Sequence, residues 1–215
     1  KTNIARAIIN MRNEQFTSSR GDRDNAPNVA ILITDGKNEP SIEDERLNPI
    51  EEARLAKTRP INPIQIFTVG VGDQIDREEL IAISSNRQVF TTASFQTLAS
   101  VINTITQTVC IITPGPPLPP VARSCNVDIM WVLDSSSSVG SSWPSVLDGL
   151  RRFIDTTNLN EARIGVVIYG STPQLSINIA TYIGENRKPE FRNAIQRLPF
   201  LQSPTADVDR ALQLA

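Results

Sequence analysis

The chain has 215 residues, with 21 basic and 23 acidic side chains and a formal net charge of −2. This near balance gives no general attraction for nucleic acid or for an anionic membrane surface. The chain has no histidine, which removes the usual imidazole base and the Ser–His and Cys–His nucleophile pairs, so we expect a binding protein rather than an enzyme.

The N-terminal part alternates predicted helices and strands. Two apolar runs have no polar face, as is typical of strands buried in a parallel sheet. Ser41 can cap a helix whose first turn is acidic and whose end is basic. This order predicts an α/β fold. The predicted elements are a helix after Thr2, a strand over Asn28–Thr34, a helix over Ser41–Lys57, a strand over Ile64–Val71, a helix over Arg77–Ser84, a strand over Gln88–Thr91 and a helix from Ser94.

A proline-rich stretch then divides the chain. Residues 111–124 contain five prolines, which favour stiff polyproline II geometry over a helix or a central strand. We therefore expect a linker at 111–124 between an N-terminal part, 1–110, and a C-terminal part, 125–215. No run of 18 apolar residues occurs, so we expect no membrane span.

The C-terminal part continues the α/β pattern. Its predicted elements are a strand over Val127–Leu133, a helix over Trp143–Thr156, a strand pair over Arg163–Tyr169 and Leu175–Tyr182, a helix over Pro189–Leu198 and another helix near Asp207.

A serine-rich tract follows the strand that ends at Leu133. Asp134 is followed by hydroxyls at Ser136 and Ser138, so three oxygens can turn toward one point. Ligands of open α/β sheets bind at such strand ends. Mg²⁺ prefers oxygen ligands, keeps several waters and uses few carboxylates. The alternative is a polar turn in which Asp134 caps the next helix.

Four segments together resemble the von Willebrand factor A domain family. Asp134–Ser138 is similar to the DxSxS motif that opens these domains, and Val29–Gly36 ends in a similar TDG motif. Ile66–Gly72 resembles the next family strand, and Thr2–Ile8 resembles the segment that carries the metal-site threonine. The resemblance implies a doubly wound, mostly parallel sheet flanked by helices. It also implies a metal-ion-dependent adhesion site (MIDAS) for Mg²⁺, or for Mn²⁺ or Ca²⁺.

The order of these segments differs from the family order, in which DxSxS comes first. The interpretation we favour is that 1–110 is the C-terminal part of a first domain and 125–215 the N-terminal part of a second, in a tandem array. Its metal ligands would be Thr2 and Asp35 in the first domain, and Asp134, Ser136, Ser138 and Thr205 in the second. The alternative is one circularly permuted domain.

A repeat favours the tandem interpretation. Thr205–Leu212 repeats the segment at 2–8, which a single permuted domain does not need. When the two segments are aligned at their ends, Leu212 with Ile8, the position of the metal-site threonine in the second domain falls on Ala206. Either Thr205 takes that role or the second site lacks its threonine ligand.

Cys110 and Cys125 are the only cysteines, and they bracket the linker. Their position favours disulfides in an oxidising compartment. In extracellular members of the family, a cysteine before the first strand pairs with one after the last helix. The resemblance therefore implies partners outside this chain for both, and a direct Cys110–Cys125 bridge is the alternative.

The function expected from this resemblance is adhesion in the extracellular matrix. A partner protein, collagen above all, would offer an acidic residue to the metal. The tandem arrangement is similar to that of matrilins, collagen VI chains and the byssal thread matrix protein of mussels, and we lean to the last kind. The alternative is a structural spacer or assembly module with a degenerate metal site. Arg20–Asp22 spells an integrin-recognition tripeptide, which we interpret as a chance match.

Overall fold

The computed structural model describes residues 2–40, 42–111, 125–170 and 172–201. Their strands form one six-stranded sheet in the order β3-β2-β1-β4-β5-β6. Every neighbouring pair is parallel except β5 and β6, which are antiparallel. The strands are β1 (Asn28–Thr34), β2 (Ile64–Val71), β3 (Val89–Thr92), β4 (Asp128–Asp134), β5 (Arg163–Tyr169) and β6 (Pro173–Ile177).

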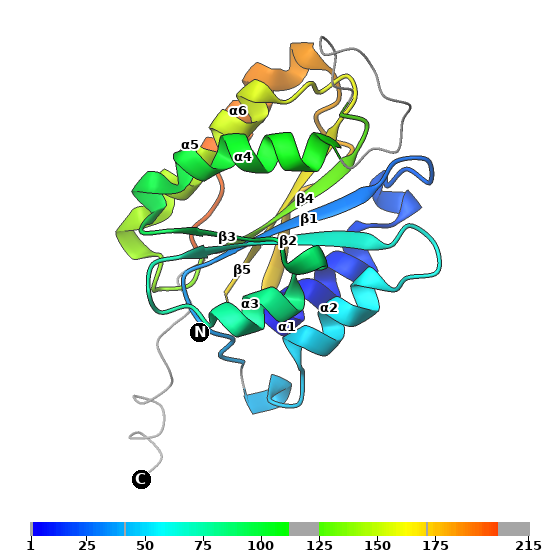
Figure 1. The fold of residues 1–215 in the computed structure, drawn as a ribbon. Coiled ribbons are helices and arrows are strands. Elements are labelled where there is room, and N and C mark those ends of the chain that lie inside the picture. The colour runs from blue at the N-terminus through cyan, green and yellow to red at the C-terminus, as the bar shows by residue number, and fades with distance from the viewer. Residues whose placement is uncertain (1, 41, 112–124, 171, 202–215) are drawn as a thin grey trace, which may run out of the picture.

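Helices cover both faces of the sheet (Figure 1). Helices α1 to α3 lie against one face and α4 to α6 against the other, as in a doubly wound fold. The helices are α1 (Ile4–Asn10), α2 (Pro49–Lys57), α3 (Arg77–Ile83), α4 (Leu98–Ile111), α5 (Trp143–Thr156) and α6 (Lys188–Gln196). The predicted α/β class, with a mostly parallel sheet flanked by helices, is confirmed.

The central strands are buried on both faces because each face carries its own apolar cluster. In β4, Trp131 faces α5, where its ring meets that of Phe153 edge to face with centroids 4.9 Å apart. The neighbouring Met130 and Val132 face the α1 and α2 side. This alternation explains why β1 and β4 have the continuous apolar runs that predicted them.

The two parts of the chain meet in the middle of this sheet. β1, from the N-terminal part, pairs in parallel with β4, from the C-terminal part, and Ile31 lies beside Trp131. The described residues of both parts thus share one sheet and resemble the permuted alternative, so the expected pair of tandem domains is not confirmed. That the parts 1–110 and 125–215 belong to successive domains of a longer array stays a prediction, and Thr205 lies outside the described residues.

The helix predicted over Ser41–Lys57 is corrected by the structure. Ile42–Asp44 forms a single 3-10 turn, and α2 begins only at Pro49. A proline inside a helix lacks the required N–H and clashes with the preceding turn, whereas it is favourable at the first position. The N-cap is accordingly Asn48, whose side chain accepts hydrogen bonds from the backbone N–H of Ile50 and Glu51.

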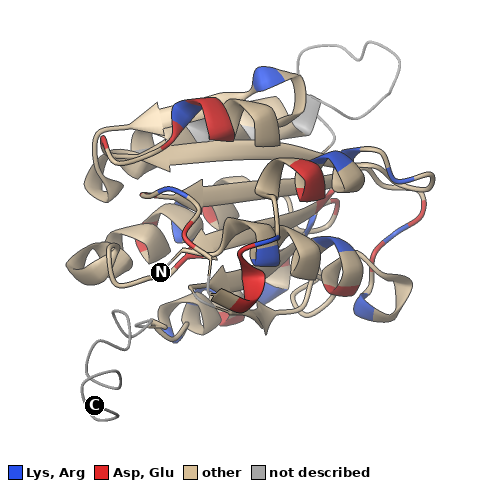
Figure 2. Cartoon of the chain, turned by 90° about the horizontal axis from the view of Figure 1, so that it is seen from below, with Lys and Arg blue, Asp and Glu red and all other residues tan. Residues whose placement is uncertain are grey.

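No helix among the described residues has the length and apolar character needed to cross a membrane. Figure 2 shows acidic and basic segments interspersed along the helices, in keeping with the small net charge of −2.

Candidate metal site

Five side chains that the sequence predicted as metal ligands come together at the carboxyl ends of β1 and β4. Asp134 ends β4, and Ser136 and Ser138 follow in the turn that leads toward α5. Asp35 directly follows β1, and Thr2 directly precedes the N-cap of α1. The sequence had assigned Thr2 and Asp35 to one domain and the other three to a second. The structure unites them because β1 and β4 are neighbours.

The hydroxyls form a continuous chain of hydrogen bonds. Thr2 Oγ1 donates to Ser136 Oγ at 3.2 Å. Ser136 Oγ and Ser138 Oγ are 2.8 Å apart, and Ser138 Oγ donates to Asp35 Oδ1 at 2.8 Å. The row therefore runs from Thr2 of the N-terminal part, through two serines of the C-terminal part, to Asp35 of the N-terminal part.

Asp134 lies beneath this row and is only 1% exposed. One carboxylate oxygen accepts a hydrogen bond from the backbone N–H of Ser136 at 2.9 Å. The other accepts from Thr34 Oγ1 at 3.0 Å. These bonds fix the carboxyl group in one orientation toward the serine turn.

Burial governs the charge of both acidic groups. It raises the pKa of Asp134 to about 6, although the Ser136 and Thr34 hydrogen bonds act in the opposite direction, and the nearby Asp35 carboxyl adds to the rise. Burial also raises the pKa of Asp35. No Lys or Arg is among the groups that shift the Asp134 pKa. The site thus holds two desolvated carboxyls, and no cationic side chain is among the groups that offset the burial of Asp134.

This donor set fits a hard divalent cation. It offers carboxylate and hydroxyl oxygens, which Mg²⁺ and Mn²⁺ prefer, and no sulfur or imidazole ligand. Within the described ranges, no group of three or more His, Cys, Asp or Glu side chains is placed to hold a metal. A site with only two carboxyls suits an ion that retains water ligands and can exchange one for an incoming oxygen.

The site opens into a cavity of about 540 Å³ at the protein surface. Its lining residues are Thr2, Asp35, Gly36, Lys37, Glu39, Gln74, Ser136, Ser137 and Ser138. A second cavity of about 230 Å³ shares Asp35, Gln74 and Ser138 with the first. Of the hydroxyl row, Ser138 is exposed at this cavity, whereas Thr2 and Ser136 are only 5% and 1% exposed, and Asp134 does not line the cavity.

Sequence reasoning missed two residues that shape this site. Thr34 stands next to the predicted Asp35 in the TDG motif, and that adjacency was the available signal. Tyr169 is fully buried, and its hydroxyl donates to the carbonyl of Ile33 at 3.2 Å, which ties the end of β5 to β1. Nothing in the local sequence indicates this contact, because the two residues lie 136 positions apart.

The tripeptide Arg20–Asp22 lies away from this site, in the loop before β1. Gly21 has a φ of +90°, and its carbonyl accepts a hydrogen bond from Arg163 Nη1 at 2.6 Å. Asp22 Oδ2 accepts from Asn28 Nδ2 at 3.2 Å. Two of its three residues, Gly21 and Asp22, are held by contacts within the protein, and its interpretation as a chance match stays a prediction.

Curated relatives are extracellular matrix proteins. Human vitrin is 25% identical over 221 residues, which cover 95% of this chain and 30% of vitrin. The mouse collagen alpha-4(VI) chain is 30% identical over 124 residues, covering 57% of this chain and 4% of the collagen. The chain thus spans less than a third of the length of either relative. The predicted location in the extracellular matrix is confirmed by these relatives.

Solved structures give a further likeness. Proximal thread matrix protein 1 from the mussel byssus matches with a TM-score of 0.44 and 21% identity, over 96% of this chain and 51% of that one. Another structure of the same mussel protein, described as having a zinc-occupied MIDAS motif, matches with a TM-score of 0.44 and 20% identity, over 94% and 49% of the two chains.

A family model matches both parts of the chain, over residues 1–104 and 128–215, and it leaves out the proline-rich stretch between them. The match includes the strand ends that carry Asp35 and Asp134 and the segment that carries Thr2. The chain belongs to the von Willebrand factor type A domain family.

Proposed function

We propose that this chain is an adhesion module that binds a partner protein of the extracellular matrix through a divalent cation. Asp134, Ser136, Ser138, Thr2 and Asp35 would hold the ion, with Mg²⁺ or Mn²⁺ favoured by the oxygen-only donor set. When bound, the cation supplies an open coordination position for a carboxylate of the partner. The proposal includes no catalytic step.

The observation that carries this proposal is the row of hydroxyls above the buried Asp134 carboxyl. Asp35 and three hydroxyls line one surface cavity, Asp134 lies behind them, and no cationic group is among those that shift the Asp134 pKa. A buried carboxylate without a compensating charge is costly, and a cation on the exposed side of the row removes that cost.

The chain's own residues set how a partner approaches. Lys37 and Glu39, which carry opposite charges, both line the larger cavity. Gln74 lines both cavities. A partner that presents an acidic residue would contact Lys37 favourably and Glu39 unfavourably. Collagen is the partner type expected from the family, and an acidic residue of collagen is the group we propose for the open position.

The alternative function is a spacer or assembly module with a degenerate metal site. The observation in its favour is Ala206, which stands where the repeated segment would need a threonine. In the arrangement described here, Thr2 contributes the hydroxyl contact to Ser136, which favours a competent site.

Calorimetric titration of the chain with Mg²⁺, Mn²⁺ and Ca²⁺ tests the proposal. We expect binding of at least one ion, its loss in Asp134→Ala, and weaker binding in Ser136→Ala. Ser137→Ala is the matched control, because Ser137 is an exposed neighbour that makes no hydrogen bond in the row. Binding to immobilised collagen should then require the same ion and disappear with EDTA.

Two results would count against the proposal in different ways. The absence of heat with all three ions would support the spacer alternative. Normal metal binding without metal-dependent capture of collagen would retain the site but exclude collagen as the partner.

A further inference from the structure

The loop that follows the metal site residue Asp35 is tied to α1 by a buried carboxylate. Asp44 lies in the 3-10 turn of this loop and is only 5% exposed. Its Oδ2 accepts hydrogen bonds from Asn3 Nδ2 at 2.8 Å and from Arg6 Nε at 3.2 Å. Its Oδ1 forms an ion pair with Nη2 of Arg6. Asp44 therefore joins the N-cap of α1 to Arg6 in its first turn.

The same loop also binds the backbone at the start of α1. The N–H of Glu39 donates to the carbonyl of Thr2 at 2.6 Å. The side chain of Asn38 accepts from the N–H groups of Ile4 at 2.9 Å and Ala5 at 3.4 Å. These N–H groups have no partner within the helix, so the loop supplies the acceptor that a helix start requires.

Asn3 connects this arrangement to the metal site. It is fully buried, and its side-chain oxygen caps α1 by accepting from the N–H of Arg6 at 3.0 Å. Its own N–H donates to the carbonyl of Gly170 at 3.0 Å. Because Asn3 adjoins Thr2 in the chain, the contacts of Asn3 restrict the backbone that carries the Thr2 hydroxyl.

We propose that Asp44 is a positioning residue for the metal site, which holds the Thr2 hydroxyl in the oxygen row through Asn3 and Arg6. This inference rests on the proposed metal-binding function. Thr2 contacts the row through a single hydrogen bond to Ser136 of 3.2 Å, so a small rotation of the first turn of α1 removes its oxygen from the site. The side-chain hydrogen bonds described for Asp44 reach Asn3 and Arg6, which are not among the five proposed ligands.

The negative charge of Asp44 could by itself strengthen metal binding. A neighbouring residue allows this charge effect to be distinguished from the positioning effect. A carboxylate near a cation site raises metal affinity through its charge alone. Glu43 adjoins Asp44 in the same turn but is exposed. Glu43→Gln and Asp44→Asn therefore remove the same charge from adjacent positions, and only the second removes the contacts with Asn3 and Arg6.

Metal titration of the whole chain with Mn²⁺ tests the proposal. We expect Asp44→Asn to weaken Mn²⁺ binding roughly 10- to 100-fold, the range seen when residues that orient metal ligands are replaced. Glu43→Gln should change the affinity less than about 2-fold, since an exposed charge in salt acts weakly. If Asp44→Asn does not fold, Arg6→Gln breaks the same ion pair from a side chain that is 43% exposed.

A double-mutant comparison tests whether Asp44 affects Mn²⁺ binding through Thr2. The rise in melting temperature caused by saturating Mn²⁺ remains measurable for weak sites and can be compared in Thr2→Ala, Asp44→Asn and the double variant. If Asp44 acts through Thr2, the double variant behaves like Thr2→Ala.

The remaining outcomes are distinct. Additive losses in the double variant would overturn the route through Thr2. Equal effects of Asp44→Asn and Glu43→Gln would overturn the positioning role. A wild-type chain that binds no metal would instead overturn the proposed function on which this inference rests.

Discussion

At the scale of single residues, Asp134 shows how burial and function oppose each other. The carboxyl is 1% exposed and has a pKa raised to about 6 by that burial. A structural core would gain stability from an apolar residue at this position, because a buried ionised carboxylate is costly without a partner charge. We infer that the cost is retained because the carboxyl serves as a metal ligand.

This environment predicts a pH dependence of stability for the metal-free protein. The folded state binds the Asp134 proton more tightly than the unfolded state, in which the pKa has its ordinary value of 3.8. The free energy of unfolding should therefore fall as pH rises from about 4 to about 6.5, by about 3 kcal/mol from this group. Urea denaturation in EDTA at a series of pH values measures the fall.

Asp134→Asn provides the control for this prediction, because the amide keeps the shape and does not titrate. Its stability should lack most of the decline, with a smaller fall left from Asp35, whose pKa burial also raises. Metal affinity should show the opposite trend and weaken below about pH 6, since cations bind the ionised carboxylate. An unchanged pH profile in Asp134→Asn would mean that Asp134 is not the group responsible.

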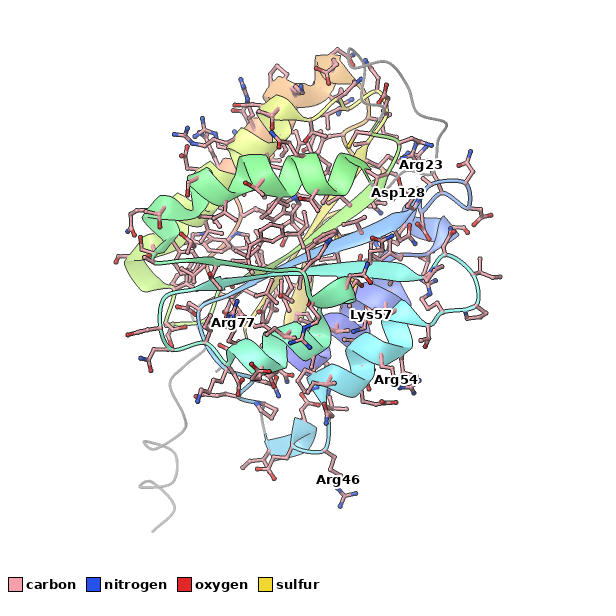
Figure 3. All side chains as sticks on the ribbon, in the orientation of Figure 1. Arg23, Arg46, Arg54, Lys57, Arg77 and Asp128 are labelled. Carbon is pink, nitrogen blue, oxygen red and sulfur yellow. The ribbon has the colours of Figure 1, made fainter. Side chains whose placement is uncertain are left out.

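At the scale of elements, a second set of contacts joins the two parts of the protein at the amino ends of the strands. Arg23 lies in the loop before β1, and Asp128 begins β4, next to each other in Figure 3. Arg23 Nε donates to Asp128 Oδ1 at 2.7 Å, and the backbone N–H of Arg23 donates to Oδ2 at 2.7 Å. The guanidinium also donates to Asn126 Oδ1 and to the carbonyls of Val127 and Glu161. This pair lies roughly 20 Å from the metal site at the other end of β4.

Replacing Arg23 should destabilise the protein strongly. Asp128 is fully buried, so Arg23→Ala leaves a buried carboxylate without its partner, at a cost of about 3 to 5 kcal/mol. Chemical denaturation at constant pH measures the loss. Arg54→Ala is the control, since Arg54 pairs with Glu51 on the exposed surface of α2, and its loss of stability should be far smaller. Equal losses in the two variants would show that the Arg23 pair is not a buried anchor.

A third element-scale contact involves Lys57, the last residue of α2. Its ammonium group donates to the carbonyls of Ala82, Ile83 and Ser84, at 3.0 to 3.1 Å. These carbonyls end α3, where a positive charge is favourable. Lys57 thus links two helices on the same face of the sheet.

At the scale of the whole molecule, the metal site depends on the pairing of the two parts of the chain. Asp134 ends β4 and two further proposed ligands follow it, whereas Asp35 follows β1 and Thr2 precedes α1. A cation bound to both groups would stabilise the sheet at the β1–β4 boundary as well as create the adhesion site. If the chain belongs to a tandem array, we expect an equivalent β1–β4 boundary and metal site within each domain of the array.

A disulfide that closes the proline-rich linker is a prediction for the molecule as a whole. Cys125 is buried, and the chain contains one other cysteine, Cys110, so we propose the direct pairing of these two residues as the alternative to partners outside this chain. Peptide mapping without reduction should recover the linked Cys110 and Cys125 peptides. Reduction should lower the free energy of unfolding by roughly 3 kcal/mol, because the bridge restricts the unfolded chain. Separate peptides, each with a free thiol, would contradict the pairing.

Much of the fold could be predicted because long apolar runs are strong signals. The strands at Asn28–Thr34, Ile64–Val71 and Arg163–Tyr169 and the helix at Trp143–Thr156 have the predicted bounds. The bounds of a helix were less predictable where a single residue overrides the charge pattern of the segment. The acidic and basic distribution of 41–57 is helix-like throughout, yet Pro49 sets the start of α2.

The sequence alone predicted which residues could bind a metal. The turn after β4 presents Asp134, Ser136 and Ser138 together because they are neighbours in the chain. Only the tertiary structure decided that Thr2 and Asp35 complete the same site, since Thr2 and Ser136 are 134 positions apart. Local periodicity specifies strands, but the partner of each strand depends on side-chain packing across the whole sheet, and here that packing sets β1 beside β4.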